Sequence, residues 1–238
     1  MGRYLVMEIR RTLRNVPFLA YTICFPVGFY LLFTQVFRGD AGQDWSAQYM
    51  VSMALYGAMG AGLTGVSARI ATERTRGWTR TLALTPLRPI GYLGIKLGAS
   101  ILLTLPVILL VMACGFVVNG VRLPVGTWLA LVPLLWLATV PFIALGVAIG
   151  YSLRDEVASG VSVALLFVLS IGGGLWMPVQ VFPHWLADIA RVLPSYRAGE
   201  LSWRVLDGHQ PFGGGALWFA AWLVALLGLA GWRFRKAS

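Results

Sequence analysis

Charged residues are scarce in this chain of 238 residues, because Asp, Glu, Lys and Arg make up only 12% of it. A soluble domain usually carries about 25%. Hydrophobic residues reach 58%, and the mean hydropathy is +0.76. The only two cysteines, Cys24 and Cys114, lie inside apolar runs and match no disulfide framework or metal-ligand spacing. The composition therefore indicates an integral membrane protein.

The sequence also lacks the motifs of common hydrolytic enzymes. It contains no GxxxxGK[ST] phosphate loop, no HExxH, no GxSxG and no Cys/His cluster. We therefore expect no catalytic residue, no metal site and no cofactor held by this chain itself. A membrane-embedded enzyme would need acids, histidines or a nucleophile gathered at one depth, and the spacing of Asp188, His184, Glu200 and His209 matches no such motif.

Six apolar runs are each long enough to cross a hydrocarbon core of about 30 Å, which takes roughly 20 helical residues. They cover residues 18–37, 49–68, 98–118, 127–151, 157–177 and 214–232. Because the connections are mostly short, we predict one all-α integral membrane domain over residues 1–238. Small residues spaced by four, such as Gly57, Ala61 and Gly65 or Gly146 and Gly150, predict close helix packing.

The charges are distributed unevenly between the segments that connect these runs. If the N-terminus is cytoplasmic, fourteen of the 19 Lys and Arg residues and four of the nine acidic residues fall on that side, a net charge of +10. The other side is then neutral. This positive-inside bias predicts a multi-pass protein of the plasma membrane with both termini in the cytoplasm. It accounts for the net charge without a nucleic-acid partner.

Ionisable residues are missing from the six predicted spans. Ion-coupled carriers and proton pumps keep such groups inside the membrane as relays. A transporter with this sequence would therefore need energy delivered from outside the chain. The absence of intramembrane carboxylates also disfavours a sodium exporter.

Two segments at the membrane surface are predicted to be helical. In residues 3–16, Leu5, Ile9, Leu13 and Val16 form one stripe, and basic residues lie largely off it, as in an interfacial amphipathic helix. In the outer segment 178–213, Pro183 can open a helix that Pro194 ends, and Ser195 can cap a second one. We expect these two short helices to dip into the outer leaflet or to lie on it.

The stretch ERTRGWTRTLALTPLRPIGYLGIKL, residues 73–97, lies between the second and third predicted spans. Gly77 interrupts the chain, leucines follow at intervals, and Pro86 and Pro89 restrict the backbone. A segment that only sets the orientation of the protein in the membrane needs basic charge, but it does not need leucines at regular intervals or two prolines three residues apart. We therefore predict a short rigid helix at the cytoplasmic surface, with a simple basic loop as the alternative.

This stretch resembles the coupling segment of type-2 ABC exporter permeases. The positions that match are Glu73, Arg76, Gly77, Leu82, Thr85, Pro86, Leu87 and Lys96. The outer segment is similar to the family pattern at Met177-Pro178, Phe182-Pro183, Trp185 and Leu193-Pro194. Two departures are Trp78, where the family usually has Thr, and Ile95, which separates Gly94 from Lys96.

The resemblance implies a membrane subunit that works with a separate cytoplasmic ABC ATPase, two copies of each, and the ATPase holds ATP and Mg. The second permease would be an identical or a related chain. The expected ATPase contacts are Glu73, Arg76, Gly77, Trp78, Leu82, Thr85, Pro86, Leu87 and Arg88. Arg154, Asp155 and Glu156 are a second possible contact.

The resemblance also implies export of a hydrophobic or amphipathic molecule, such as a drug, a natural product or a lipid-like compound. Polar residues inside the spans are candidates for lining its pathway, although each can equally be a helix-packing hydrogen bond: Ser52, Thr64, Ser162 and Ser170. Two alternatives stay open. One is a permease for polysaccharides or lipid-linked glycans, and the other is a membrane scaffold that transports nothing.

Overall fold

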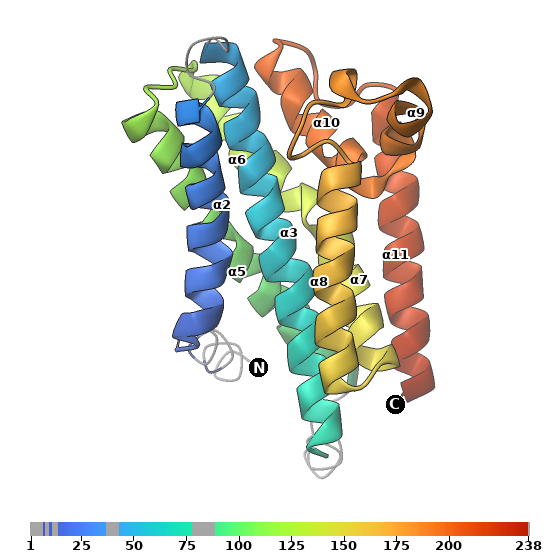
Figure 1. Cartoon of the computed structure of the whole chain (residues 1–238). Helices are drawn as coiled ribbons and strands as arrows, with labels where there is room; N and C mark the ends of the chain where they lie inside the picture. Colours follow the sequence, from blue (N-terminus) through green and yellow to red (C-terminus); the bar gives the residue numbers. More distant parts are fainter. Residues whose placement is uncertain (1–6, 8–9, 11–13, 37–42, 78–88, 238) are drawn as a thin grey trace.

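The computed structural model describes residues 7, 10, 14–36, 43–77 and 89–237, and these residues fold into helices without a β-strand (Figure 1). The all-α prediction is thereby confirmed. The elements in chain order are α2 (Val16–Val36), α3 (Gln43–Thr75), α5 (Pro89–Val118), α6 (Val125–Ala138), α7 (Val140–Ser152), α8 (Asp155–Gly172), the 3-10 helix η1 (Val179–Val181), α9 (His184–Val192), α10 (Pro194–Leu206) and α11 (Gly215–Ala237).

Five helical stretches in the described ranges are long and apolar enough to cross a membrane. They are Asp44–Thr75, Lys96–Val118, Val125–Ser152, Asp155–Gly172 and Gly215–Lys236. The first predicted span, 18–37, corresponds to α2, whose apolar stretch Ala20–Val36 is shorter. The protein is therefore a multi-pass membrane protein, and a sixth span stays a prediction.

The predicted span 127–151 is built from two helices, α6 and α7, that meet at Thr139. Pro141 occupies the first turn of α7. A proline has no backbone N–H, and its ring clashes with the carbonyl of the residue four positions earlier, so one helical hydrogen bond is lost at Pro141. The interruption is short, because Thr139 keeps α-helical angles and Ile143 donates to its carbonyl.

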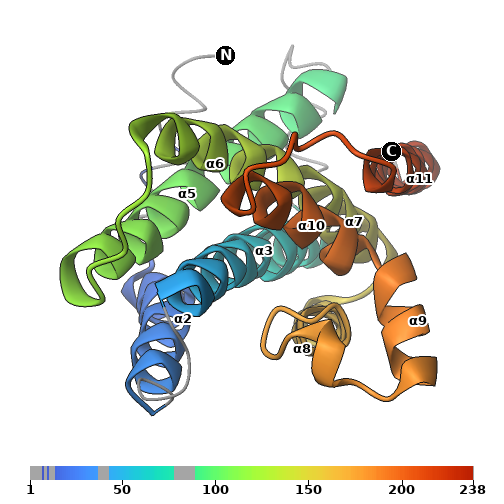
Figure 2. The same cartoon turned by 90° about the horizontal axis from the view of Figure 1, so that it is seen from above.

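Helix α3 is the centre of the bundle, and α2, α5, α7 and α8 pack around it (Figure 2). Every residue from Tyr49 to Leu63 is buried. By contrast, α8 and α11 each leave large apolar side chains exposed, such as Val168 and Val224. A helix surrounded by protein on all sides lies in the core, whereas exposed apolar faces suit contact with lipid.

Glycines on α7 bring its backbone against the backbone of α3. A Cβ atom built on Gly146 would lie 2.6 Å from the carbonyl oxygen of Leu63, and one built on Gly150 would lie 2.9 Å from that of Ser67. Small residues permit this close approach, which strengthens helix association where the hydrophobic effect gives little help. The packing predicted from the spacing of Gly146 and Gly150 is therefore present.

Two short helices, α9 and α10, precede α11, as the sequence indicated. The predicted cap of the second helix was wrong. Leu193 is the N-cap residue, Pro194 is in the first turn, and the Ser195 hydroxyl donates instead to the carbonyl of Leu169 in α8. Proline suits the first helical position because its φ angle is preset, so α10 begins before Ser195. The re-entrant placement of both helices stays a prediction.

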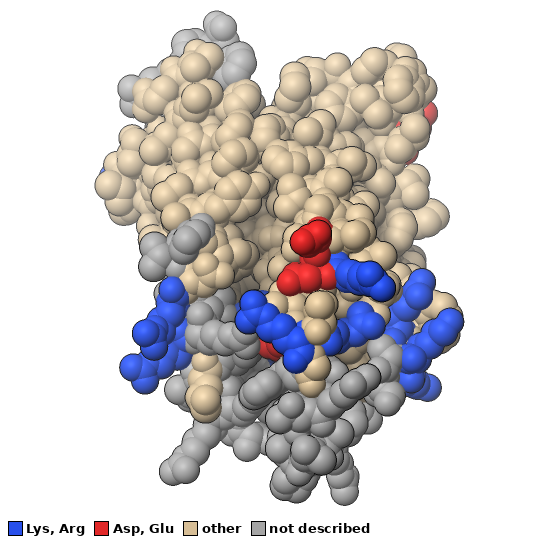
Figure 3. Space-filling view, turned by 60° about the horizontal axis from the view of Figure 1, so that its bottom comes forward, with Lys and Arg blue, Asp and Glu red and all other residues tan. Residues whose placement is uncertain are grey.

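The two ends of the bundle differ in charge. The end of α3, the connection between α7 and α8 and the end of α11 lie together at one end, which we call the basic end (Figure 1). Lys and Arg side chains gather across its face, with acidic side chains among them (Figure 3). The described basic residues on these segments are Arg69, Arg74, Arg76, Arg154, Arg233, Arg235 and Lys236.

Two predicted surface elements fall largely outside the described residues. Of the interfacial helix 3–16, the structure describes Met7, Arg10 and the residues from Arg14 onward. Residues 78–88 of the coupling segment are also outside it. Both helices therefore stay predictions.

Replacing Gly146 with Ala should destabilise the protein, because the added methyl group would collide with the Leu63 carbonyl. Overpacking typically costs about 1–3 kcal/mol. Gly228→Ala in α11 is the matched control, since a Cβ there meets nothing within 4 Å and Ala is the better helix former. The measurement is the midpoint of thermal unfolding in detergent. Equal midpoints for the two variants would contradict the packing argument.

Candidate functional site

The basic end of α3 is longer than the sequence indicated. The predicted cytoplasmic segment began at residue 69, but α3 remains helical to Thr75 and α5 already begins at Pro89. Arg76 and Gly77 follow α3, and residues 78–88 lie outside the described residues. The last turns of α3 and the first turn of α5 are therefore the two places where this segment joins the bundle.

An ion pair between Glu73 of α3 and Lys96 of α5 is buried at this end. The Lys96 Nζ lies 2.8 Å from Glu73 Oε1 and 2.8 Å from Oε2. The two side chains are only 4% and 3% exposed, respectively. A charge removed from water needs a partner of opposite sign, so the position of each helix depends on the other.

Two further polar contacts tie the same turns of α3 to its other neighbours. The Arg74 Nη1 donates to the carbonyl of Gly150 at 2.9 Å, and its guanidinium lies 5.8 Å from the centre of the Tyr151 ring. The Thr72 hydroxyl donates to Asp155 Oδ1 of α8 at 2.7 Å. Residues 72–74 therefore connect α3 to α5, α7 and α8, Glu73 and Arg74 through their charged groups and Thr72 through a hydroxyl that donates to a carboxylate.

Gly77 ends the helical region with a change of backbone direction. Its φ angle is +70°, and its N–H donates to the carbonyl of Arg74 at 3.1 Å. Glycine adopts this left-handed conformation without strain, which explains its use just after helix ends. A Cβ atom on Gly77 would meet nothing within 4 Å, so the backbone angle, rather than lack of space, favours glycine here.

The structure places only part of the predicted ATPase contact. Glu73 is turned into the protein, whereas Arg76 is exposed and Gly77 is half-buried beyond the end of α3. The remaining predicted contacts lie outside the described residues: Trp78, Leu82, Thr85, Pro86, Leu87 and Arg88. Their role stays a prediction. Sequence reasoning missed the structural roles of Thr72, Arg74 and Tyr151.

The second predicted contact lies at the start of α8. Arg154 is the N-cap residue, and Asp155 and Glu156 occupy the first turn, where negative charge is favourable against the helix dipole. Asp155 also accepts the hydrogen bond from Thr72. Arg154 and Glu156 are exposed. This group is thus close in structure to residues 72–74, and contact with an ATPase stays a prediction.

All four candidate pathway residues donate a hydrogen bond to a carbonyl of their own helix. Ser162 and Ser170 are fully buried and donate to the carbonyls of Ala158 and Phe167, at 2.6 and 3.2 Å. The Thr64 hydroxyl donates to the carbonyl of Gly60 at 2.7 Å. These bonds lie within single helices, so they neither join two helices nor exclude a pathway role, which stays a prediction.

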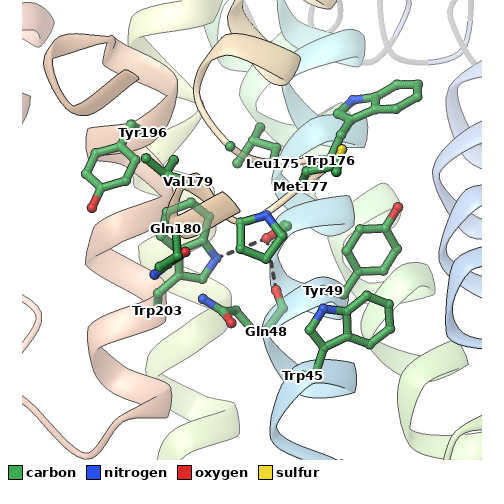
Figure 4. Close-up of a pocket in the computed structure, with 13 residues that line it drawn as sticks. Trp45, Gln48, Tyr49, Leu175, Trp176, Met177, Val179, Gln180, Tyr196 and Trp203 are labelled. Atoms are coloured by element: carbon green, nitrogen blue, oxygen red, sulfur yellow. Dashed lines mark hydrogen bonds between the residues drawn. The ribbon is translucent and has the colours of Figure 1, made fainter. Parts of the chain in front are cut away.

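Ser52, the fourth candidate, lies in a small pocket at the opposite end of α3 (Figure 4). The indole N–H of Trp203 in α10 donates to its hydroxyl at 3.0 Å, and that hydroxyl donates to the Gln48 carbonyl at 2.9 Å. Trp45 and Tyr49 stack beside it with ring centres 5.1 Å apart. The pocket encloses about 40 Å³, enough for one or two water molecules.

Removing one member of the buried ion pair should destabilise the protein strongly. Glu73→Leu removes the carboxylate that the buried Lys96 ammonium contacts, and Lys96→Met removes the ammonium that the buried Glu73 carboxylate contacts. Each should cost about 3–5 kcal/mol, and the double variant should recover most of that loss. The measurement is thermal unfolding in detergent of the wild-type protein, the two single variants and the double variant, which gives the coupling free energy between Glu73 and Lys96.

The control is the exposed pair of Asp188 and Arg191, whose side chains are 74% and 57% exposed. Arg191→Gln should change stability by less than about 1 kcal/mol. If the effects of Glu73→Leu and Lys96→Met were simply additive in the double variant, the ion pair would not hold α3 against α5.

Comparisons with known proteins agree with this arrangement. Residues 25–232 match the family described as ABC-2 family transporter protein. The chain is also 31% identical over 234 residues to the Bacillus subtilis (strain 168) protein named "Putative transport permease YvfS". The aligned region covers 97% of this chain and 95% of that relative. The resemblance to this family is confirmed, and the chain belongs to the ABC-2 family of transporter membrane proteins.

Proposed function

We propose that this chain is the transmembrane subunit of an ATP-driven exporter that moves a hydrophobic or amphipathic molecule out of the cell. The observation that carries this proposal is the geometry of α3. Its last two turns are bonded to α5, α7 and α8, and the predicted coupling segment follows directly. The similarity to a protein named as a transport permease supports the same function.

The energy would come from a separate cytoplasmic ABC ATPase, because the sequence has no phosphate loop of its own. Two ATPase copies with bound ATP and Mg would act on two permease chains. The excess of Lys and Arg at the basic end favours a cytoplasmic position for this end in the plasma membrane, with both termini on the same side.

Coupling would begin when the ATPase dimer closes and displaces residues 78–88. Such a displacement reaches Gly77 and then α3, a helix of 33 residues and about 50 Å in length. The polar contacts of residues 72–74 make α5, α7 and α8 follow. At the other end, the hydrogen bond between Trp203 and Ser52 passes the movement to α10. This is domain closure transmitted through a rigid element.

The small pocket around Ser52, which we call the outer pocket, does not support export of polysaccharides or lipid-linked glycans. Glycan permeases would stack sugar rings on aromatic side chains, and the pocket does contain Trp45, Tyr49 and Trp203. However, its volume of about 40 Å³ suits water rather than a sugar ring. Drugs, natural products or lipid-like molecules are the cargo that we propose.

Purification of the chain from its native membrane tests the partner. An ABC ATPase should copurify in a stoichiometric amount, together with a second copy of this chain or a related permease. If no ATPase appeared, even after coexpression with a cassette ATPase from the neighbouring gene, the non-transporting scaffold would replace this proposal.

Replacing Gly77 with Val should uncouple the complex. A β-branched residue at φ +70° is strained by roughly 1–2 kcal/mol, which corresponds to about a tenfold loss of the required conformation. Gly77→Asn is the matched control, because Asn tolerates left-handed angles. The measurement is substrate-stimulated ATP hydrolysis in proteoliposomes, with membrane insertion checked separately.

Leu82→Asp should also abolish stimulated hydrolysis, since it places a charge on the apolar edge of the predicted coupling helix. Normal stimulated hydrolysis in both Gly77→Val and Leu82→Asp would contradict a coupling role for this segment.

A further inference from the structure

An apolar groove lies on the outside of the bundle, between α5 and α6. Its volume is about 390 Å³, and binding sites for small molecules commonly measure about 300–1,000 Å³. None of the described residues that line it carries a charge: Leu109, Met112, Ala113, Phe116, Trp128, Leu129 and Val132. The groove is therefore large enough for an organic ligand, and its walls suit a hydrocarbon chain.

Helical spacing produces the groove. The four lining residues of α5 follow one another at intervals of three, one and three positions, which places them on one face of that helix. Met112 is only 3% exposed and lies deepest, whereas Leu109 and Phe116 are exposed. Ala113 is also exposed and presents only a methyl group, so the groove stays open between the larger side chains.

The groove begins near the end of the bundle opposite the basic end. Phe116 lies two residues before the end of α5, and Trp128 is the fourth residue of α6 (Figure 1). From Phe116 to Leu109 the groove runs seven residues along α5, which corresponds to about 10 Å. The hydrocarbon of one leaflet is about 15 Å deep. The groove therefore has the length of most of an acyl chain in that leaflet.

A cation lies at the open end of this groove. The guanidinium of Arg122 is 4.5 Å from the centre of the Phe116 ring, which belongs to the wall. Arg122 is exposed, and it makes no ion pair with a carboxylate among the described residues. The other described arginines at this end do contact the protein: Arg191 with Asp188, Arg197 with Glu200, and Arg204 with the Gln210 carbonyl. The N–H donors of Arg122 are therefore available to an anion.

The start of α6 adds positive potential beside Arg122. Pro124, two residues further on, is the N-cap residue and supplies no side-chain hydrogen bond, and the first turn of α6 contains no acidic residue. The N–H groups at a helix start and the helix dipole favour a negative charge. Electrostatics at the groove end thus complements an anion, while the groove itself complements a hydrocarbon.

We infer that the groove holds an anionic phospholipid of the adjacent leaflet, with its phosphodiester at Arg122 and one acyl chain along α5 and α6. The planar guanidinium binds phosphate oxygens in pairs. The positive-inside rule gives no reason for a cation at this end of the bundle, whereas a bound phosphate does. The lipid is a resident ligand rather than the cargo, so the inference is independent of the proposed function.

Binding of radiolabelled phosphatidylglycerol tests the headgroup contact. The full chain is stripped of lipid in a neutral detergent, and about one lipid should bind per chain. Phosphatidylcholine with the same acyl chains, whose headgroup is neutral overall, should compete at least tenfold more weakly. Arg122→Gln should weaken binding of phosphatidylglycerol about tenfold, because hydrogen bonds to a charged group are lost. Arg191→Gln is the matched control, since it removes an exposed cation at the same end but outside the groove, and its affinity should not change.

A second pair of variants tests the acyl-chain contact. Ala113→Phe should fill the groove and weaken binding of phosphatidylglycerol about tenfold, with the folded state checked by size exclusion. Ala220→Phe on α11 is the control, because Ala220 is also exposed and also lies five residues from the end of its helix at this side. Its affinity should stay that of the wild-type protein.

Four results would overturn the inference. The first is the absence of saturable binding, and the second is equal affinity for both lipids, which would leave an apolar groove without recognition of the anion. Unchanged affinity in both Arg122→Gln and Ala113→Phe would place the lipid elsewhere. If Ala113→Phe changed the oligomeric state and left lipid affinity intact, the groove would be an interface with a second copy of the chain. None of these measurements needs the ATPase, so failure of the proposed function would leave the lipid site standing.

Discussion

The buried ion pair between Glu73 and Lys96 constrains the rest of the structure more than any other contact. Helices in lipid gain little from the hydrophobic effect, so their relative positions depend on packing and on polar contacts. Two opposite charges with almost no exposure must meet, and this fixes the register of α3 against α5. Arg74 and Thr72, on either side of Glu73, then fix α7 and α8 relative to the same helix.

Three kinds of contact hold α3 at different positions along its length. Charged side chains hold its basic end, the backbone contact with Gly146 holds its middle, and Trp203 bonds to it near the other end. A close backbone contact leaves little freedom to slide, because the packed atoms would collide. A displacement at one end of α3 should therefore move the helix and its neighbours together, as the proposed ATP-driven mechanism requires.

Features that depend on local sequence could be predicted, and those that depend on distant residues could not. Hydropathy located the apolar helices, and Pro183 and Pro194 marked α9 and α10. Ser195 was misplaced because Pro194 starts the helix first. The charges after residue 68 ended the predicted second span, but α3 continues to Thr75, and Glu73 in its last turns meets a partner 23 residues away. No local spacing reveals such a pair.

The positive-inside rule explains how many basic residues lie at one end, but it leaves open where each side chain points. In the described part of the chain, Lys96, Arg74 and Arg69 are directed at protein partners, whereas Arg76 is exposed. Orientation alone would be satisfied by arginines on any exposed surface at this end. The contacts of Lys96 with Glu73 and of Arg74 with the Gly150 carbonyl join α3 to α5 and α7, and topology alone does not require them. The placement of these two cations is therefore a property of helix packing as well as of orientation in the membrane.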